Sequence, residues 1–446
     1  MLHASVSLYI ADSEKSEPVL EYNAEKSLTP ASVMKLVTTA AAIELLGPQY
    51  TFKTVIGYTG EFNKRTGKLK GDIVIKGGGD PCLGSPYFTD HYNNFPDKWI
   101  SEIKRLGIKK IEGRIITDDS YYDFQPVPAK WLWEDAGNYY GAGAYGLSLF
   151  DNTYGIRFTK GADSLLIVKE IIPEECRTEL SNWLTSAGTS DEGYVFAAPY
   201  STNGWLAGTI PSNLNDFVLK ASVTDPPLLM AKMTDRKLKA AGITISEEPT
   251  TFRLEQITTG GKMVLIDEIT SPTLSEIINV LNHESVNLYA EHLVKELGKR
   301  YSGKGSTESG IKILKEFLNN SRIGSEGMFI EDGSGLSPVN SINAKGLAGL
   351  LYFMKKNGKY FPEYYNSLPD AGKNGTLKNY FRDPVFDSRL KAKSGSMTRV
   401  RSYAGYFTTI SGKQMIFSII INNYTGTSRQ LIARIEDIIK ETILNE

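Results

Sequence analysis

Ser32 and Lys35 are the residues of this sequence whose types and spacing most directly suggest chemistry. They stand three positions apart, and Lys35 directly precedes the mostly apolar run 36–46. A helix that begins near Pro30 would place the hydroxyl and the amine on one face, one turn apart, where the amine can take the proton of the hydroxyl. The pattern therefore predicts a serine nucleophile with a lysine as its base.

The context of Ser32 separates it from other Ser-x-x-Lys matches. Pro30 suits a first helical turn, and the positive end of the helix would stabilise a developing alkoxide. The apolar run predicts a buried helix, so desolvation would lower the pKa of Lys35 and favour its neutral form. A neighbouring cation such as Lys393 would act in the same direction. The other three matches are Ser101/Lys104, Ser309/Lys312 and Ser388/Lys391.

Two further motifs complete a set of three. The segment 281–291 contains Ser285 and Asn287 as Ser-x-Asn, and Lys393-Ser394-Gly395 follows near the C-terminus on an expected strand. Ser-x-x-Lys, Ser-x-Asn and Lys-Ser/Thr-Gly, in this order, are the motifs of penicillin-binding proteins and serine β-lactamases. Ser-x-Asn alone is a weak signal, because it also occurs at Ser201/Asn203 and Ser341/Asn343.

On these residues the chain resembles a penicillin-binding protein of the D-alanyl-D-alanine carboxypeptidase/endopeptidase family (low-molecular-mass class C). Ser285 follows Lys35 by 250 positions (285 − 35), far more than in a β-lactamase, and this family fills that gap with inserted domains. The resemblance covers nearly the whole chain. It includes the segments 30–36, 77–81, 332–337, 371–377 and 402–406.

The resemblance implies a serine-type D-Ala-D-Ala carboxypeptidase (DD-peptidase) that cleaves peptidoglycan stem peptides and cross-links through an acyl-enzyme. Ser32 would attack the carbonyl of the penultimate D-Ala, and the backbone N–H groups of Ser32 and Ser396 would form the oxyanion hole. Ser285 would relay the proton to the leaving amine, and Asn287 would hold the substrate backbone. β-Lactam antibiotics such as penicillin would acylate the same serine.

The resemblance also assigns the substrate-binding residues. Lys393 and Ser394 would bind the terminal carboxylate, beside Gly395, Ser396 and Met397. Family members that prefer meso-diaminopimelate stems resemble this chain at 131–135 and at Tyr140, where Asp135 would meet the distal amino group. Those members carry an arginine directly after the 332–337 segment, whereas this chain has Pro338. Arg399 and Arg401 are the alternatives for the distal carboxylate.

Composition agrees with a globular enzyme. The chain has 446 residues, which suggests two or three domains, and a net charge of −1 with 23% charged and 41% hydrophobic residues. This balance predicts no nucleic-acid partner. The apolar runs 347–353 and 415–421 are far shorter than the ~20 residues that cross a bilayer, so we expect no transmembrane segment.

The N-terminus does not read as a signal peptide. Residues 4–12 alternate like a strand and have neither a basic lead nor a long apolar stretch. Because the implied substrate lies outside the inner membrane, we expect a mature periplasmic or extracytoplasmic protein rather than a cytosolic one. Cys82 and Cys176 imply no disulfide framework and leave a single bridge open. We expect no metal and no cofactor, because the four histidines are scattered and no zinc motif occurs.

Both ends of the chain predict parts of one α+β catalytic domain. Strands are expected at 4–12, 18–22, 389–394, 402–409 and 414–422, and isoleucines at 432, 435, 439 and 443 mark a final amphipathic helix. One antiparallel sheet with helices packed on it, and the Ser32 helix beneath, would give a penicillin-binding/serine β-lactamase-like domain. We assign residues 1–60 and 262–446 to it.

The middle of the chain has a different succession of predicted strands and helices, which indicates a large insertion that forms two smaller domains. Strand, helix and strand alternate over 72–76, 97–106 and 112–117, and the helical segment 226–241 with 242–245 repeats this pattern. We assign 61–154 and 216–261 to an inserted α/β domain. Short strands at 147–160, 164–171 and 194–200 indicate a nested, mostly β domain at 155–215.

Two glycine-rich segments are expected to be loops. Gly77-Gly78-Gly79-Asp80 lacks a following Gly-Lys-Ser/Thr, so it predicts a turn rather than a phosphate loop. The tight loop 332–335 lies beside the active site if the resemblance holds. Two other functions stay open: an idle peptidoglycan-binding scaffold, and a β-lactamase, for which no deacylating glutamate is assigned.

Overall fold

The chain forms two compact units in a computed structural model that describes residues 3–15, 17–161, 166–176, 179–215, 217–257 and 262–446. Unit 1 comprises Met1–Tyr50, Pro128–Lys130 and Thr273–Glu446, and unit 2 comprises Thr51–Val127 and Trp131–Pro272. The division of the insertion into an α/β domain and a nested β domain stays a prediction. Its predicted border at 261 lies outside the described residues.

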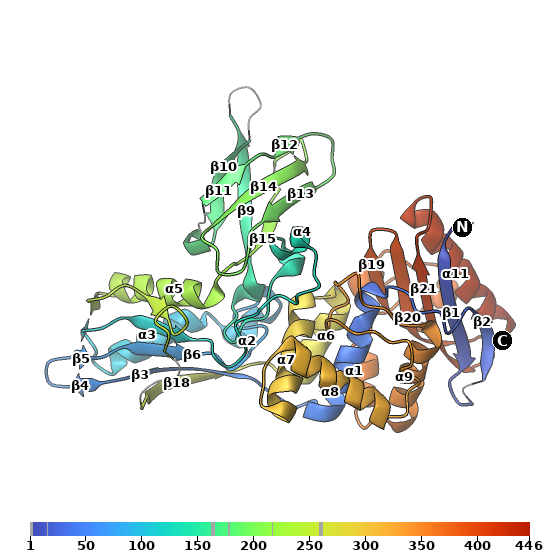
Figure 1. The fold of residues 1–446 in the computed structure, drawn as a ribbon, viewed down its shortest axis with the longest axis horizontal. Coiled ribbons are helices and arrows are strands. Elements are labelled where there is room, and N and C mark those ends of the chain that lie inside the picture. The colour runs from blue at the N-terminus through green and yellow to red at the C-terminus, as the bar shows by residue number, and fades with distance from the viewer. Residues whose placement is uncertain (1–2, 16, 162–165, 177–178, 216, 258–261) are drawn as a thin grey trace. The chain divides into compact units, whose positions relative to one another are not determined.

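Unit 1 contains one five-stranded antiparallel sheet built from both ends of the chain, as the sequence predicted (Figure 1). The strand order is β19-β20-β21-β1-β2. Strand β1 joins the N-terminal part to β21, in a register that pairs Ser5 with Asn422. The bounds are β1 Ser5–Asp12, β2 Pro18–Tyr22, β19 Leu390–Met397, β20 Val400–Thr408 and β21 Gln414–Asn422.

Helices cover both faces of this sheet. Helix α11 (Ser428–Asn445) packs Ile435, Ile439 and Ile443 into the core with Phe417 and Ile419 of β21, which confirms the predicted amphipathic helix. Side chains alternate across a strand, so Ile416, Ser418 and Ile420 face the opposite side, which α9 (Ala344–Asn357) covers. The other helices are α1 Lys35–Leu46, α6 Leu274–Glu284, α7 Asn287–Ser302, α8 Thr307–Asn320 and α10 Phe361–Asn366.

The segment that carries Ser32 differs in detail from the expected helix. The α-helix α1 begins only at Lys35, and Ser32 lies in a preceding 3-10 turn, Ala31–Met34. This turn contacts β19 and β20, while α1 packs among α6, α7 and α8. Residues 35–43 of α1 are all buried. A mostly apolar helix is stable in water only when other elements enclose it, which these neighbours do.

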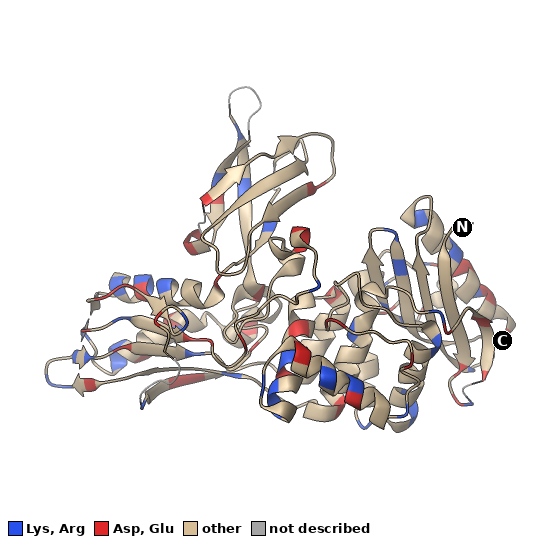
Figure 2. Cartoon of the chain, in the orientation of Figure 1, with Lys and Arg blue, Asp and Glu red and all other residues tan. Residues whose placement is uncertain are grey.

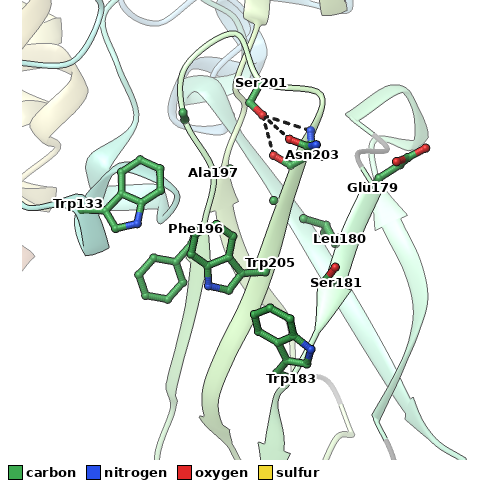
Figure 3. Close-up of a pocket in the computed structure, with 12 residues that line it drawn as sticks. Trp133, Glu179, Leu180, Ser181, Trp183, Phe196, Ala197, Ser201, Asn203 and Trp205 are labelled. Atoms are coloured by element: carbon green, nitrogen blue, oxygen red, sulfur yellow. Dashed lines mark hydrogen bonds between the residues drawn. The ribbon is translucent and has the colours of Figure 1, made fainter.

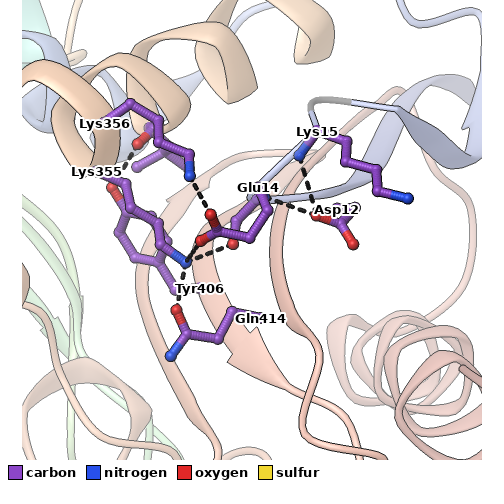
Figure 4. Close-up of polar contacts among 9 residues, drawn as sticks. Asp12, Glu14, Lys15, Lys355, Lys356, Tyr406 and Gln414 are labelled. Carbon is purple, nitrogen blue, oxygen red and sulfur yellow. Dashed lines mark hydrogen bonds and ion pairs between the residues drawn. The ribbon is translucent and has the colours of Figure 1, made fainter.

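Polar contacts fix the turn between β1 and β2 against α9 (Figure 4). Lys355 lies 3.3 Å from Glu14, and Lys356 pairs with the same carboxylate, which keeps the pKa of Glu14 below its usual value. Asp12 accepts the N–H groups of Glu14 and Lys15. Such exposed pairs contribute little to stability and chiefly orient the turn.

Helices α3 (Phe95–Arg105) and α5 (Pro226–Ala240) of unit 2 pack on strands of two mixed sheets. The two halves of the predicted repeat lie side by side, because the short strands β7 and β16 pair in parallel. One sheet is β17-β8-β6-β3-β18, with β3 Lys53–Tyr58, β6 Ile73–Lys76, β8 Ile115–Asp118, β17 Thr250–Thr251 and β18 Val264–Thr270. The other is β16-β7-β5-β4, with β4 Glu61–Asn63, β5 Lys68–Lys70, β7 Lys110–Ile111 and β16 Thr244–Ile245.

Two further sheets of unit 2 hold the remaining strands. The antiparallel sheet β10-β9-β15 consists of β9 Thr153–Lys160, β10 Leu166–Ile172 and β15 Leu219–Ser222. The other sheet consists of β11 Glu179–Asn182, β12 Thr185–Ser186, β13 Glu192–Phe196 and β14 Asn203–Ile210; β11 and β12 pair in parallel with one edge of β14, and β13 pairs antiparallel with its other edge. The start of the strand predicted at 164–171 lies outside the described residues. The short helices are α2 Thr89–Tyr92 and α4 Trp133–Ala136.

Two findings complete the fold. Cys82 and Cys176 are both free and buried, which decides the question that the sequence left open. Within the described part of the chain, the helices are too short or too polar to cross a bilayer. Figure 2 shows basic and acidic residues interspersed along the outer helices of unit 1.

Candidate active site

Ser32 and Lys35 form a close pair at the start of α1. The Lys35 Nζ lies 2.8 Å from the Ser32 Oγ, which confirms that the three-residue spacing brings the two groups together. Ser32 is half-buried and Lys35 is fully buried. The hydroxyl is therefore accessible from one side, while the amine behind it is shielded from water.

Two other segments supply the remaining partners of the Lys35 amine. The amine donates to the Asn287 Oδ1 at 2.6 Å, where Asn287 is the first residue of α7, and to the backbone carbonyl of Ser334 at 2.8 Å. Thr38 on α1 donates to the carbonyl of Gly333 at 2.7 Å. The loop 332–335 thus lies against the Ser32–Lys35 pair.

Burial sets the charge of Lys35. Desolvation lowers the pKa of this amine to about 7, and the nearby carboxyl groups of Asp332 and Glu291 act in the opposite direction. The repulsion expected between Lys35 and Lys393 contributes to the pKa of Lys393. Burial first, and then the charge of Lys35, lower the pKa of Lys393 well below its usual value.

Lys393 and Ser285 form a second pair. The buried Lys393 on β19 donates to the Ser285 Oγ at 2.9 Å and to the carbonyl of Ser394 at 2.9 Å. Ser285 ends α6 in a left-handed backbone conformation, with φ of 60°. This kink between α6 and α7 presents the Ser285 hydroxyl to one lysine and the Asn287 amide to the other.

Strand β19 approaches the Ser32 turn closely at Gly395. A Cβ at this position would lie 2.9 Å from the Ser32 backbone nitrogen and 2.7 Å from the Pro30 oxygen, so only glycine permits the contact. Ser402 on the neighbouring strand donates to the same Pro30 oxygen at 2.5 Å. Beyond Gly395, Ser396 is exposed and Met397 is half-buried on the same strand.

The Ser394 hydroxyl contacts the segment 371–377, one of those on which the family resemblance rests. It donates to the hydroxyl of Thr376 at 2.8 Å, in the 3-10 turn Gly375–Leu377. The structure therefore gathers the three motifs, the loop 332–335 and the segment 371–377 around one point in unit 1.

Glu291 is a site residue that the sequence analysis did not single out. It is buried on α7, and its carboxylate accepts the N–H groups of Gly333 at 3.1 Å and of Ser334 at 2.8 Å. Burial raises the pKa of Glu291 to about 8, with a further contribution from the charge of Asp332. The only available signal was its place one helical turn after Asn287, which puts both side chains on one face of α7.

Asp332 shapes the same loop from within. Its carboxylate accepts the N–H groups of Gly335 at 2.7 Å and of Ser337 at 2.6 Å. Gly335 has φ of +82°, and a Cβ there would lie 2.0 Å from the Ala31 oxygen. The loop therefore packs directly against the turn that carries Ser32.

The predicted specificity residues lie elsewhere in the chain. Asp135 and Tyr140 belong to unit 2, whereas every other predicted site residue belongs to unit 1. Asp135 is buried on α4, its Oδ2 has no hydrogen-bond partner, and burial raises its pKa to about 6. Of the two arginines, Arg401 contacts the hydroxyl of Ser428, while Arg399 is exposed in the turn between β19 and β20.

The other Ser-x-x-Lys pairs lie on the surface. Ser101 is exposed on α3, Lys312 is exposed on α8, and Lys391 pairs with Asp370 at 2.9 Å. The described residues also contain no cluster of His, Cys, Asp and Glu that could hold a metal ion. Only Ser32 combines the spacing with a buried amine.

Comparison with known proteins defines the class. The fold matches the crystal structure of penicillin binding protein 4 (dacB) from Haemophilus influenzae, with a TM-score of 0.84, 20% identity, and coverage of 99% of this chain and 96% of that one. That protein is also known in complex with a β-lactam. The fold is thus that of a penicillin-binding protein.

Sequence comparison gives the family. The model of the D-Ala-D-Ala carboxypeptidase 3 (S13) family matches residues 1–441. The chain is 28% identical over 449 residues to a D-alanyl-D-alanine carboxypeptidase of Actinomadura sp., covering 95% of this chain and 79% of the relative. It is 23% identical over 430 residues to the carboxypeptidase DacB of H. influenzae, covering 95% and 86%. This chain belongs to the D-Ala-D-Ala carboxypeptidase 3 (S13) family, which confirms the resemblance.

The contact between the 332–337 loop and the Ser32 turn can be tested at Gly335. Gly335→Ala adds both left-handed strain and a clash with the Ala31 oxygen, whereas Gly412→Ala, at φ of +88° with nothing within 4 Å, adds the strain alone. The strain costs roughly 1–2 kcal/mol, and we expect the clash to cost about 1–3 kcal/mol more. Urea unfolding of the full-length variants, followed by circular dichroism, measures the loss of unfolding free energy in each. Equal losses of unfolding free energy in Gly335→Ala and Gly412→Ala would show that the loop moves aside without cost and that its contact with the Ser32 turn is not tight.

Proposed function

We propose that this enzyme, a serine-type D-alanyl-D-alanine carboxypeptidase/endopeptidase by family, uses Ser32 as its nucleophile and Lys35 as the base. The observation that carries the assignment is the distance of 2.8 Å between the Ser32 Oγ and a fully buried amine. A serine hydroxyl is a weak nucleophile until a neighbouring base removes its proton. The pKa of about 7 leaves much of Lys35 neutral near pH 7.

The hydrogen bonds of Lys35 support its role as a base. A neutral amine has two N–H donors and one lone pair. The Asn287 Oδ1 and the Ser334 carbonyl are both acceptors, so they use the two donors. The lone pair is then left for the Ser32 hydroxyl, which donates its proton to the amine as it attacks.

The acyl-enzyme forms through a tetrahedral intermediate that carries an oxyanion. The Ser32 Oγ bonds to the carbonyl carbon of the penultimate D-Ala, and the bond from that carbon to the terminal D-Ala nitrogen breaks. The N–H groups of Ser32 and Ser396 stabilise the oxyanion, and the close approach of β19 at Gly395 supports this pairing. Water then adds to the ester carbonyl and releases Ser32.

Ser285 acts on the leaving group, and Lys393 binds the terminal carboxylate. Ser285 passes a proton to the departing amine, and Asn287 also holds the substrate backbone. Without substrate, the lowered pKa of Lys393 favours its neutral form, hydrogen-bonded to Ser285. An arriving carboxylate raises that pKa, so Lys393 becomes a cation where Ser394 and Met397 bind the substrate.

The substrates are peptidoglycan stem peptides and their cross-links, and β-lactams occupy the same site. Because these peptides lie outside the inner membrane, we place the enzyme in the periplasm or another extracytoplasmic space. Asp135, with Tyr140 nearby on the chain, receives the free distal amine of the stem peptide, since its unpartnered Oδ2 offers an acceptor.

Labelling with benzylpenicillin tests the nucleophile. We expect intact-mass analysis to show one long-lived adduct, which is lost in Ser32→Ala because Ser32 is the only serine of the four Ser-x-x-Lys pairs whose lysine is fully buried. Ser101→Ala is the matched control, since it removes the serine of an exposed Ser-x-x-Lys pair and should leave the adduct intact. An adduct that survives in Ser32→Ala would place the nucleophile elsewhere. Rapid turnover would indicate a β-lactamase, and the absence of any adduct an idle scaffold.

The pH dependence of acylation tests Lys35. Only the neutral amine accepts a proton, so the rate should rise through pH 7 and fall about tenfold per pH unit below it, because the pKa is about 7. Lys35→Arg should abolish acylation, because a guanidinium stays protonated. Lys104→Arg, at the exposed pair on α3, provides the control. A rate that is flat between about pH 5 and pH 8 would argue against Lys35 as the base.

Asp135→Asn tests the specificity assignment. Loss of a charge-assisted hydrogen bond should lower kcat/KM by roughly tenfold for a stem peptide with a free distal amine. Benzylpenicillin acylation should hardly change, since that molecule has no such amine, and Glu134→Gln on the exposed neighbour is the control. In the native enzyme the preference should fade below about pH 6, where Asp135 becomes protonated. A parallel fall in both reactions would make Asp135 structural.

A further inference from the structure

One sheet of unit 2 displays aromatic rings where a sheet normally displays polar side chains. On strands β13 and β14, Val195 and Leu206 are fully buried on one face. The residues that alternate with them, Tyr194, Phe196 and Trp205, lie on the opposite face. An antiparallel sheet with one solvated face usually carries polar residues there, so this aromatic face needs a functional reason.

Trp205 is the centre of the aromatic group (Figure 3). Phe196 stacks on it, with ring centroids 5.2 Å apart and planes 13° from parallel. Trp133 lies 6.1 Å from Trp205 on one side, and Trp183 lies 6.4 Å away. Trp183 and Trp133 are 66% and 51% exposed, which is costly for large apolar side chains unless a ligand covers them.

These rings line a groove of about 690 Å³, which is within the ~300–1,000 Å³ range of small-molecule sites. Ser181, Ser201 and Asn203 supply hydroxyl and amide groups along it, and Glu179 is its one charged lining residue. Strand β14 itself carries no charge and is uniformly tan in Figure 2. The groove, which we call the aromatic groove, therefore suits a neutral ligand with both apolar faces and polar edges.

We propose that the aromatic groove binds an uncharged pyranose oligosaccharide of the kind found in a glycan strand. A pyranose ring exposes C–H bonds on its faces, which are attracted to the negative face of an indole ring. Its hydroxyl groups lie at the edges, where Ser181 and Asn203 can exchange hydrogen bonds with them. The lack of basic residues in the lining disfavours a polyanion.

The groove is continuous with the segment proposed to receive the stem peptide. Trp133 lies two residues from Asp135 on α4, which packs on β13. The contact is tight, because Val195 donates its N–H to the Asn138 Oδ1 at 3.1 Å and a Cβ on Gly137 would lie 1.9 Å from the Val195 oxygen. In peptidoglycan the stem peptide is covalently attached to the glycan. This inference rests on the proposed function and extends it to the sugar part of the same polymer.

Binding is tested on the full-length protein with the tetramer of β-1,4-linked N-acetylglucosamine. Three of the five tryptophans surround the groove, so saturable fluorescence quenching should report binding, with a Kd on the order of 1 mM. Trp183→Ala should weaken binding at least about tenfold, and Trp183→Phe should restore part of it. Tyr22→Ala removes a similarly exposed ring from β2 and should bind like the native chain. No binding by the native protein, or equal binding by Trp183→Ala, would overturn the proposal.

A second measurement separates this inference from the catalytic assignment. Trp183→Ala should be acylated by benzylpenicillin at the native rate and should cleave a sugar-free stem peptide normally. Its KM for polymeric peptidoglycan should rise several-fold. If the native enzyme is not acylated, the proposed function fails whatever the groove binds. If Trp183→Ala impairs the sugar-free peptide equally, or instead abolishes a concentration-dependent dimer seen by sedimentation, the saccharide site is refuted.

Discussion

The burial of the Lys35 amine is the constraint on which the active site depends. An amine removed from water must have its hydrogen-bonding groups satisfied by protein, and three segments provide the partners: the Ser32 turn, the start of α7 and the loop 332–335. All three segments belong to unit 1. Loosening any of them would let water reach the amine and raise its pKa, which would remove the proposed base.

The same constraint explains the surroundings of α1. The helix is buried along its first nine residues, so helices α6, α7 and α8 must enclose it. The loop 332–335 is held from one side by Glu291 and from within by Asp332. These carboxyl groups, Asp332 first, also oppose the desolvation of Lys35 and so raise its pKa, which burial lowers to about 7.

Unit 1 tolerates a very large insertion because the ends of the insertion lie together. The N–H of Leu274 donates to the Tyr50 carbonyl at 2.8 Å, and that of Ser275 donates to the Pro48 carbonyl at 3.0 Å. The chain therefore leaves unit 1 and re-enters it at nearly the same place, which disturbs few of its contacts. Asp135 and the aromatic groove both belong to this insertion.

The sequence by itself predicted the Ser32–Lys35 pair, the order of the three motifs and the strands at both termini, because these depend on local spacing and alternation, and the three motifs together indicated the family. Only the tertiary structure decided what depends on contacts between distant segments. Glu291 became visible as a partner of the 332–335 loop only once α7 was packed beside it. The lowered pKa values of Lys35 and Lys393 required the burial of both amines to be known. The aromatic groove joins tryptophans 133, 183 and 205, which no periodicity connects, because sheet pairing alone brings them together.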